Sequence, residues 1–374
     1  MIPFNKPSIT KLEEETVLDC LRTGQLSGDH KYTKLCEEEL KNKFGMRAVL
    51  TTSGSSSLDI SAILCNLTNN DEVILPSYTF VSTANSFALR GAKIVFADVD
   101  SKTMNISPDD IENKITNNTK AICAVHYAGV SCNMKKLQEI AQKYNLKLVE
   151  DAAQAIGSYY NGIPLGTIGD MGCFSFHETK NIVMGEGGAL VVKDDNLFDM
   201  AEIIREKGTN RKQFFKGFVD KYTWQTYGSS YLPSDILSAL LYAQLVRFDE
   251  IQQKRINIWN RYYDELAETE KSGNLIRPYI PDYATNNAHM FYCFLENENV
   301  RSKLIDELKK QEIIAPFHYI PLHLSPVGKN LGYKEGDLPV TEEYSRRLIR
   351  LPLYADMTEE EQERVIKCLK KTLN

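Results

Sequence analysis

Long hydrophobic runs are the first feature that this 374-residue sequence lacks. No apolar stretch approaches the roughly 20 residues that a helix needs to cross a bilayer. The first five residues do not follow the pattern of a signal peptide. Internal repeats and low-complexity tracts are absent as well. We therefore expect a globular protein of the cytoplasm that has no membrane partner.

Cysteine and histidine form no pattern typical of a disulfide framework or a metal site. The eight cysteines are scattered, with no Cys-x-x-Cys spacing, so we predict reduced thiols and no zinc. His318 and His323 are the only histidines close together, and Pro321 between them excludes the helical spacing of metal ligands. Loop hydrogen bonds and contact with a substrate are both open interpretations of this pair, and no metal is expected.

An excess of positive charge is also missing. The chain has 44 lysines and arginines against 50 aspartates and glutamates, and a formal net charge of −6. Because binding to a phosphate backbone needs a basic face, we do not expect nucleic acid as the main partner. Hydrophobic content of 43% and charged content of 25% are ordinary for a globular protein.

One lysine stands in a context typical of covalent cofactor chemistry. Lys180 lies between the apolar stretch 173–176 and the glycine-rich turn 185–188. Asp151 follows another apolar run, 146–149, which has the character of a buried parallel strand. Ligands of open α/β sheets bind beyond the carboxyl ends of the strands, so Asp151 should point into a site. A surface lysine and a helix-capping aspartate are the alternatives when each residue is taken alone.

Lysine and aspartate together meet the needs of pyridoxal phosphate. This cofactor is attached to a lysine as a Schiff base, and it withdraws electrons best when a buried carboxylate keeps its ring nitrogen protonated. The pairing of Lys180 with Asp151 therefore favours an enzyme that transfers amino groups. The lysine must also have a lowered pKa to shuttle protons, which burial provides.

Two further segments supply parts of such a site. The Ser- and Thr-rich residues 51–57 precede a helical pattern, so N–H groups and hydroxyls gather at a helix N-terminus, where phosphate binds. Tyr78 and Phe80 follow the strand-like residues 72–75 and are candidate rings for stacking. Ordinary helix capping and core packing are the alternative interpretations of these two segments.

Short apolar runs alternate with helical patterns between residues 71 and 192, which predicts a mostly parallel α/β sheet flanked by helices. A long helix is expected from Ser234 through Ile251, leading into a smaller α+β domain. We place the large cofactor-binding domain at 1–245, with an N-terminal segment able to pack on the small domain at 246–374. The expected strands are 73–75, 94–97, 121–125, 146–149, 173–176 and 189–192.

These motifs together resemble the DegT-type sugar-nucleotide aminotransferases, a fold-type I pyridoxal-phosphate family, along essentially the whole chain. Within that family the chain is most similar to the dTDP-4-amino-4,6-dideoxygalactose transaminases. The segments that carry this closer resemblance are 76–85, 205–211, 220–224, 287–292 and 318–323. The family resemblance implies a seven-stranded type of sheet and a homodimer with active sites at the interface.

The resemblance also implies a role for individual residues. Lys180 would be the Schiff-base lysine, Asp151 the partner of the ring nitrogen, and Phe80 the stacking ring. Gln154 would contact the phenolic oxygen of the cofactor. The hydroxyls that bind the phosphate would be those of Ser55, Ser56 and Ser175.

The segment Gly228–Asp235 departs from the family pattern. Many members carry polar Asn and Arg residues here that reach the neighbouring subunit's cofactor phosphate, whereas this chain has Ser230 and Leu232. The sequence therefore leaves the cross-subunit phosphate donor unidentified. Some relatives replace the lysine by histidine and become dehydratases; His177 is near, but Lys180 is intact, which argues for transamination.

A basic stretch in this acidic chain is a candidate substrate-binding loop. Its cations are Lys207, Arg211, Lys212, Lys216 and Lys221, with aromatic residues between them and beside them. A solvated loop is one interpretation, and a site for the diphosphate and rings of a sugar nucleotide is the other. We take Lys207, Arg211 and Tyr222 as candidate substrate contacts. The resemblance adds His318 and His323 at the mouth of the site.

The expected reaction transfers an amino group from L-glutamate to dTDP-4-dehydro-6-deoxy-D-glucose, giving dTDP-4-amino-4,6-dideoxy-D-galactose and 2-oxoglutarate. The choice of sugar rests on the closer resemblance, because no residue spacing reports which carbon reacts. The alternatives are a 3-keto-6-deoxy nucleotide sugar, the gluco epimer of the 4-amino product, and a pyridoxal-phosphate sugar dehydratase. A non-catalytic regulatory protein of the same fold is a further alternative.

Overall fold

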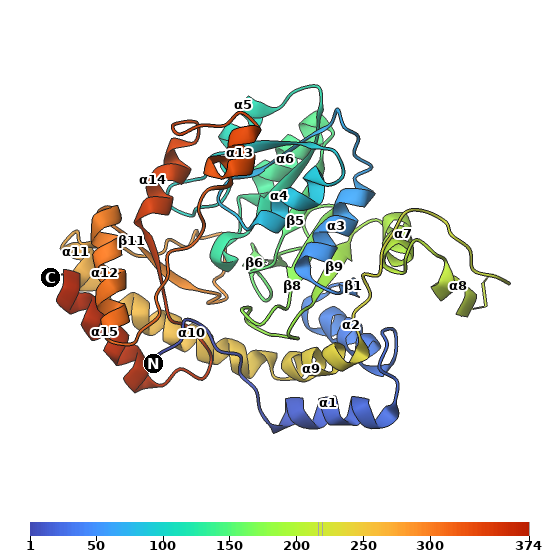
Figure 1. Cartoon of the computed structure of the whole chain (residues 1–374), viewed down its shortest axis with the longest axis horizontal. Helices are drawn as coiled ribbons and strands as arrows, with labels where there is room; N and C mark the ends of the chain where they lie inside the picture. The colour runs from blue at the N-terminus through green and yellow to red at the C-terminus, as the bar shows by residue number, and fades with distance from the viewer. Residues whose placement is uncertain (216, 219, 374) are drawn as a thin grey trace.

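The computed structural model describes residues 1–215, 217–218 and 220–373. Within these ranges, the central sheet has seven strands: β1 (Ala48–Thr51), β2 (Glu72–Pro76), β3 (Lys93–Ala97), β4 (Thr119–Val125), β5 (Lys147–Asp151), β8 (Met171–Ser175) and β9 (Gly188–Val192). Their spatial order is β1-β9-β8-β5-β4-β2-β3 (Figure 1). β9 runs antiparallel to β1 and β8, whereas β8, β5, β4, β2 and β3 are parallel to one another.

The six predicted strands are present as β2, β3, β4, β5, β8 and β9, and the mostly parallel sheet is confirmed. The apolar-run pattern does not predict β1. This strand has four residues, all buried, and it runs directly into the Ser- and Thr-rich turn. A run this short is not distinguished from a loop by periodicity alone.

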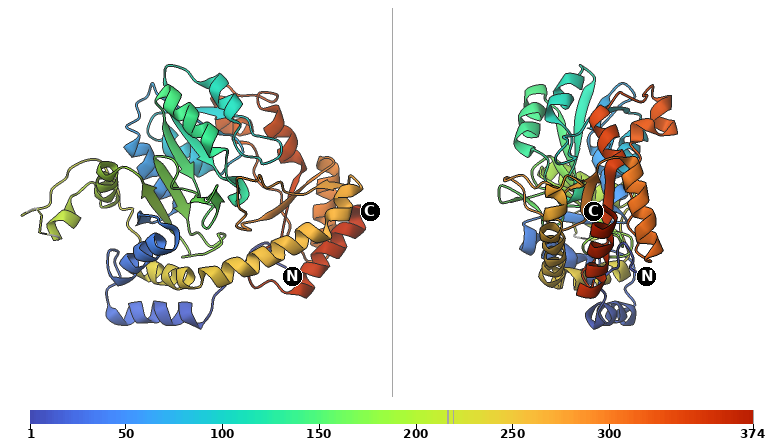
Figure 2. Two further views of the ribbon diagram at one scale, coloured as in Figure 1. Left: turned by 180° about the vertical axis from the view of Figure 1, so that it is seen from behind. Right: turned by 90° about the vertical axis from the view of Figure 1, so that its left-hand side faces the viewer.

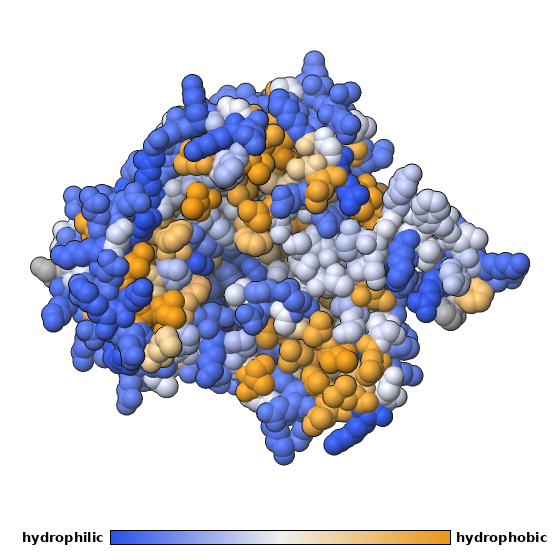
Figure 3. Space-filling model, viewed as in Figure 1, coloured by the Kyte–Doolittle hydropathy of each residue, from blue (hydrophilic) through white to orange (hydrophobic). Residues whose placement is uncertain are grey.

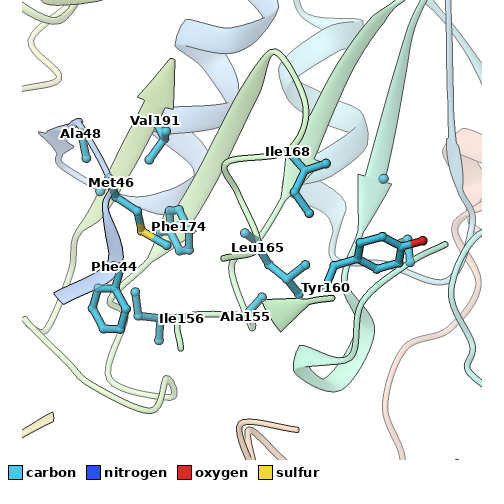
Figure 4. Close-up of a cluster of buried hydrophobic side chains, with 14 of the residues drawn as sticks. Phe44, Met46, Ala48, Ala155, Ile156, Tyr160, Leu165, Ile168, Phe174 and Val191 are labelled. Atoms are coloured by element: carbon cyan, nitrogen blue, oxygen red, sulfur yellow. The ribbon is translucent and has the colours of Figure 1, made fainter. Parts of the chain in front are cut away.

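Side chains alternate between two cores along the strands, because successive residues of a strand point to opposite faces. In β2, Ile74 belongs to one core, while Val73 and Leu75 belong to the other. Figure 4 shows part of the first core, where Phe174 lies beside Met46. The first core is completed by α2 (Lys31–Phe44), α5 (Pro108–Lys114), α6 (Met134–Tyr144) and α9 (Asp235–Val246), and the second by α3 (Gly54–Leu64), α4 (Val81–Ala88) and α7 (Asp195–Arg205).

The long helix predicted from Ser234 through Ile251 is instead two helices, α9 and α10 (Phe248–Glu265). The break is at Arg247, whose φ of −90° and ψ of 7° leave the α-helical range. Its guanidinium donates to Glu13 Oε1 at 2.6 Å, which ties this point to the N-terminal region. Apolar residues of both helices pack in the same core, so the helical spacing continues across the break and periodicity does not reveal it.

A second, smaller sheet lies at the other end of α10. It contains β10 (Leu275–Ile276), β11 (Phe291–Leu295) and β12 (Leu348–Leu351), all antiparallel, and is flanked by α12 (Glu298–Lys310), α14 (Pro339–Arg347) and α15 (Glu359–Leu373). These elements have a core of their own. Ile2 belongs to that core and pairs with Ile313. We propose the division into 1–245 and 246–374 on the basis of these separate cores.

The remaining elements are short or lie outside the two sheets. They are α1 (Lys11–Thr23), α8 (Arg211–Phe215), α11 (Ala267–Lys271), α13 (Pro326–Asn330), the hairpin of β6 (Tyr159–Tyr160) and β7 (Ile163–Pro164), and the 3₁₀ turns η1 (Tyr127–Gly129) and η2 (Leu322–Leu324). Figure 2 shows that α8 and the loops beside it extend away from the body of the molecule. Among the described residues, no helix combines the length and apolar character needed to cross a membrane.

Candidate active site

A cavity of about 660 Å³ opens where the carboxyl ends of β5 and β8 meet the N-terminus of α3. Asp151 and Ser175, the last residues of these two strands, line it, as does Lys180. The opposite wall comes from the smaller sheet and the N-terminal segment, through Arg350 and Phe4. Residues far apart in the sequence therefore surround one space.

Lys180 lies in the loop that follows β8, and its backbone N–H donates to the His177 carbonyl oxygen at 2.9 Å. Burial lowers the pKa of its ammonium from 10.5 to about 8. The carboxylate of Asp151 opposes this shift, and the guanidinium of Arg350 adds to it. About a tenth of the lysine is therefore a neutral amine at pH 7, a far larger share than a pKa of 10.5 allows, and the neutral form is the one that acts as nucleophile and proton carrier.

Asp151 is a buried carboxylate held by two donors. Thr83 donates its hydroxyl to Asp151 Oδ2 at 2.7 Å, and the Ala153 N–H donates to Oδ1 at 3.2 Å. The Thr83 hydroxyl also lies 2.8 Å from that of Thr79. These contacts aim the carboxylate into the cavity, where it can pair with a positively charged ring nitrogen.

The N-terminus of α3 presents a cradle for a small anion. Ser53 caps the helix, and Gly54 follows it at the first helical position. A Cβ on Gly54 would lie 2.8 Å from Ser175 Cβ, so only glycine lets the helix approach β8 this closely. Ser55 and Ser175 line the cavity, and the Ser55 hydroxyl donates to Ser82 at 2.7 Å. Backbone N–H groups and hydroxyls at a helix N-terminus suit a phosphate dianion.

Ser56 differs from the other two predicted phosphate ligands. It is buried and is not among the residues that line the cavity. Its hydroxyl lies 2.7 Å from that of Thr52 and 2.9 Å from that of Ser53, within the turn. In this structure Ser56 supports the cradle from behind, because its hydroxyl contacts those of Thr52 and Ser53 and its backbone N–H donates to the capping side chain of Ser53.

Gln154 and Phe80 lie on the cavity wall where the sequence places them. The Gln154 side chain accepts from the Ala128 N–H at 2.7 Å and donates to the Tyr319 hydroxyl at 3.2 Å. The Phe80 ring is 57% exposed at the start of α4, so a planar ligand can stack on it. Tyr319 lies between the two, with its ring centre 6.5 Å from that of Phe80.

The two neighbouring histidines have different positions. His318 lines the cavity, stacks on Tyr319 at 3.6 Å between ring centres, and lies 2.8 Å from the Tyr127 hydroxyl. Burial holds its pKa well below the ordinary value, so its ring is neutral. His323 is fully buried, with one ring nitrogen 2.7 Å from Ser77 and the other 3.1 Å from Glu342. Direct substrate contact by His323 does not fit this geometry.

The three candidate residues of the basic stretch do not line this cavity. Lys207 and Arg211 both contact Glu206 Oε1, at 3.0 and 3.4 Å. Tyr222 is half exposed on the segment that extends with α8 away from the body (Figure 2). Lys216, another predicted cation, lies outside the described residues. Within one chain, the structure does not bring this segment to the site.

Several lining residues come from other parts of the chain and were not predicted as site residues, notably Thr83, His289 and Arg350. Thr83 donates its hydroxyl to Asp151, and the spacing of Thr79 and Thr83, four residues apart after the predicted strand 73–75, is a local signal for it. No local pattern marks Arg350, because its strand reaches the cavity through the packing of the smaller sheet.

These residues fit pyridoxal phosphate. Asp151 suits the ring nitrogen, the α3 cradle suits the phosphate, Phe80 offers a stacking face, and Lys180 has the lowered pKa of an amine that forms a Schiff base. The fold and the site together define a pyridoxal-phosphate-dependent aminotransferase. Residues 7–370 match the model of the DegT/DnrJ/EryC1/StrS aminotransferase family, and the chain belongs to that family.

Relatives and solved structures cover the whole chain. The spore coat polysaccharide biosynthesis protein SpsC of Bacillus subtilis is 32% identical, over 99% of this chain and 96% of its own length. GDP-perosamine synthase of Vibrio cholerae is 29% identical over the full length of both. The sugar aminotransferase Spr1654 of Streptococcus pneumoniae in its PMP form superposes with a TM-score of 0.92 at 27% identity, over 100% of this chain and 99% of that one.

These comparisons confirm the expected family, the fold-type I architecture and the pyridoxal-phosphate cofactor, since structures of Spr1654 exist in PLP and PMP forms. The protein is a sugar aminotransferase of this family. A closer relationship to the dTDP-4-amino-4,6-dideoxygalactose transaminases is not shown. The similar proteins concern different sugars: one is GDP-perosamine synthase, and another is Helicobacter pylori PseC, an aminotransferase involved in the biosynthesis of pseudoaminic acid.

Proposed function

We propose that this enzyme transfers the amino group of L-glutamate to C4 of dTDP-4-dehydro-6-deoxy-D-glucose and releases dTDP-4-amino-4,6-dideoxy-D-galactose and 2-oxoglutarate. The observation that carries the transfer reaction is the convergence of Lys180 and Asp151 on one cavity. The choice of sugar is supported by the resemblance of segments such as 76–85 and 318–323. Residues of both segments, including Phe80 and His318, line the cavity.

We assign the cofactor contacts to the residues that surround the cavity. Asp151 would pair with the ring nitrogen, Phe80 would stack on the ring, and Ser55 and Ser175 would bind the phosphate above Ser56. Gln154 would contact the phenolic oxygen. When bound, pyridoxal phosphate supplies the electron sink that makes a carbon next to the transferred nitrogen acidic.

Lys180 would carry the proton in both halves of the reaction. Its Nζ takes a proton from the α-carbon of glutamate in the first half and delivers one to the sugar carbon in the second. Burial in the cavity wall keeps the pKa of this amine low and so makes its lone pair more available. One site that serves two substrates in turn should show ping-pong kinetics.

We further propose a homodimer whose active sites lie at the interface. The α8 segment extends from the body in a way that suits contact with a second subunit (Figure 1). Figure 3 shows apolar residues gathered over the region of α1 and α9, and exposed leucines of this part include Leu18, Leu21 and Leu26. In such a dimer Lys207, Arg211 and Tyr222 would bind the nucleotide diphosphate at the neighbour's cavity.

Replacement of the lysine tests the transfer reaction. Lys180→Ala is expected to lower turnover by at least about 10³-fold, because it removes the proton carrier and the covalent attachment of the cofactor. Circular dichroism and thermal melting should show an intact fold. Lys367→Ala on the exposed face of α15 is the matched control and should keep wild-type turnover. Substantial turnover by folded Lys180→Ala would contradict the assignment.

The sugar is tested by its product. The purified holoenzyme is incubated with L-glutamate and dTDP-4-dehydro-6-deoxy-D-glucose, and the product is analysed by proton NMR. A 4-amino sugar with galacto coupling constants is the expected result. Gluco coupling constants would support the amino transfer to C4 but contradict the proposed stereochemistry of the product. A cofactor spectrum that changes with glutamate while no amino sugar forms would point to a different sugar, such as a 3-keto isomer.

A further inference from the structure

Arg350 is a cation in the cavity wall that the reaction described above does not use. It lies on β12, opposite Tyr292 of β11, and its backbone N–H donates to the Pro316 carbonyl at 3.0 Å. Its Nε and Nη2 both donate to the carbonyl oxygen of Phe317, at 3.2 and 2.9 Å. The Phe4 ring covers the guanidinium at 4.5 Å. The group is therefore fixed in place by the smaller sheet and the N-terminal segment.

No carboxylate balances this charge among the described residues. Arg346 and Arg347, which precede it on α14, each pair with a glutamate. Arg350 has a carbonyl oxygen and an aromatic face as its partners, and the groups that interact with it electrostatically are tyrosines. Burial accordingly lowers its pKa. A partly buried guanidinium without a counter-ion is a site that an anion can complete.

The surroundings show which end of the cavity this charge serves. Arg350, His289 and His318 line the cavity together with Lys180, and the charge of Arg350 contributes to the lowered pKa of the lysine and of both histidines. Asp151 and the phosphate cradle of α3 belong to the other side, on the central sheet. An anion bound at Arg350 would thus lie beside the lysine amine and apart from the cradle.

We propose that Arg350 binds the α-carboxylate of the amino-acid donor. The proposal rests on the proposed transamination. The α-carboxylate is bonded directly to the carbon whose proton Lys180 takes, so it must lie close to the lysine amine. The diphosphate of a nucleotide sugar is separated from the reacting carbon by the sugar ring. The planar fork of arginine also matches a carboxylate through two parallel hydrogen bonds.

The test compares three donors in the first half-reaction of the holoenzyme, followed by the change of the cofactor spectrum. The donors are L-glutamate, L-isoglutamine, which has an amide in place of the α-carboxylate, and L-glutamine, which has an amide at the side chain. The variants are Arg350→Gln, Arg350→Lys and the control Arg346→Gln on exposed α14. Calorimetry with α-methyl-L-glutamate, which has no α-hydrogen to lose, measures binding without turnover.

Wild-type enzyme should prefer glutamate over isoglutamine, and Arg350→Gln should lose most of this preference. The loss should be on the order of 10- to 100-fold in the rate constant divided by Kd, as for a charge-assisted hydrogen bond. Arg350→Lys should be intermediate, since it keeps the charge and loses the fork. Binding of α-methyl-L-glutamate should weaken in parallel, and Arg346→Gln should match the wild type.

Other outcomes would overturn the proposal. Wild-type kinetics with glutamate in Arg350→Gln would exclude the contact. Arg350→Gln could instead lose the preference for glutamate over glutamine and keep the preference for glutamate over isoglutamine. That result would assign Arg350 to the side-chain carboxylate of the donor. Arg350→Gln could also react normally with glutamate and be slow only in the second half-reaction, in which the amino form of the cofactor reacts with the keto sugar. That result would assign Arg350 to the nucleotide. The calorimetry uses no sugar. It therefore tests binding of the donor carboxylate even if the enzyme does not act on the proposed sugar.

Discussion

At the residue scale, the chemistry depends on how the fold changes the properties of ordinary side chains. Lys180 is an unremarkable residue type, but burial and Arg350 lower its pKa to about 8. Asp151 accepts hydrogen bonds from the Thr83 hydroxyl and the Ala153 N–H, which fix the position of its carboxylate. Each of these effects needs neighbours that the chain supplies from separate elements.

The pKa of Lys180 makes a prediction for the protein without cofactor. Only the neutral amine is acylated, and its fraction rises with pH through the pKa. Labelling of Lys180 by acetic anhydride should therefore have its midpoint near pH 8, well below that of free lysine side chains near 10.5. Mass spectrometry of peptides labelled between pH 6 and 11 measures this profile. A midpoint near 10.5 would show that the amine is solvated.

At the element scale, Asp235 shows how one side chain joins two helices. It begins α9, and its carboxylate accepts from the backbone N–H groups of Tyr32 and Thr33 at the start of α2, at 2.9 and 2.8 Å. It also accepts from the Thr33 hydroxyl at 2.7 Å. The cap residue of α2 itself, His30, makes no side-chain capping bond. A distant residue therefore caps this helix.

Asp235→Ala should lower the free energy of unfolding by about 2 kcal/mol, because it leaves two buried N–H groups without an acceptor. Denaturant unfolding followed by circular dichroism measures the change. Asp249→Ala is the control: its carboxylate pairs with Lys43 at the surface, and its loss should cost less than about 1 kcal/mol. Equal effects of the two replacements would contradict the capping role.

At the scale of the whole molecule, the N-terminal segment connects the two halves of the cavity. Ile2 is buried in the core of the smaller sheet, Phe4 covers Arg350, and the Asn5 side chain donates to the Glu178 carbonyl at 3.0 Å. Glu178 belongs to the loop that carries Lys180. The first residues of the chain thus help to set the distance between the lysine and the arginine.

The proposed dimer makes a prediction at this same scale. Sedimentation velocity should give twice the 42.5 kDa mass of one chain. If the α8 segment serves the neighbour's cavity, mixing Lys180→Ala subunits with Lys207→Ala/Arg211→Ala subunits should restore activity, because each hybrid has one complete site. Random pairing should recover about one quarter of wild-type activity.

Inactive hybrids, in a preparation shown to exchange subunits, would mean that the segment serves its own cavity. A monomer with full activity would contradict the dimer itself. The control is a mixture of two separately prepared batches of Lys180→Ala, which should remain inactive because every hybrid lacks the lysine.

Much of the fold follows from local patterns. The buried strands have apolar runs, and α6 is capped by Asn133, a residue type favoured at this position, which accepts from the Lys136 N–H. Predictions were wrong or missing where the local pattern of apolar residues does not report the structure. The break at Arg247 keeps the apolar spacing of a single helix, and β1 is too short to have a pattern.

The sequence by itself determined the sheet, the family and the central pair Lys180 and Asp151, because strand periodicity and motifs are properties of neighbouring residues. Only the tertiary structure decided that His318 faces the cavity while His323 is buried between Ser77 and Glu342. It also decided that Arg350 lies in the wall opposite the central sheet. The contact of His323 with Ser77 joins residues 246 positions apart in the sequence, and it exists only once the elements that carry them have packed together.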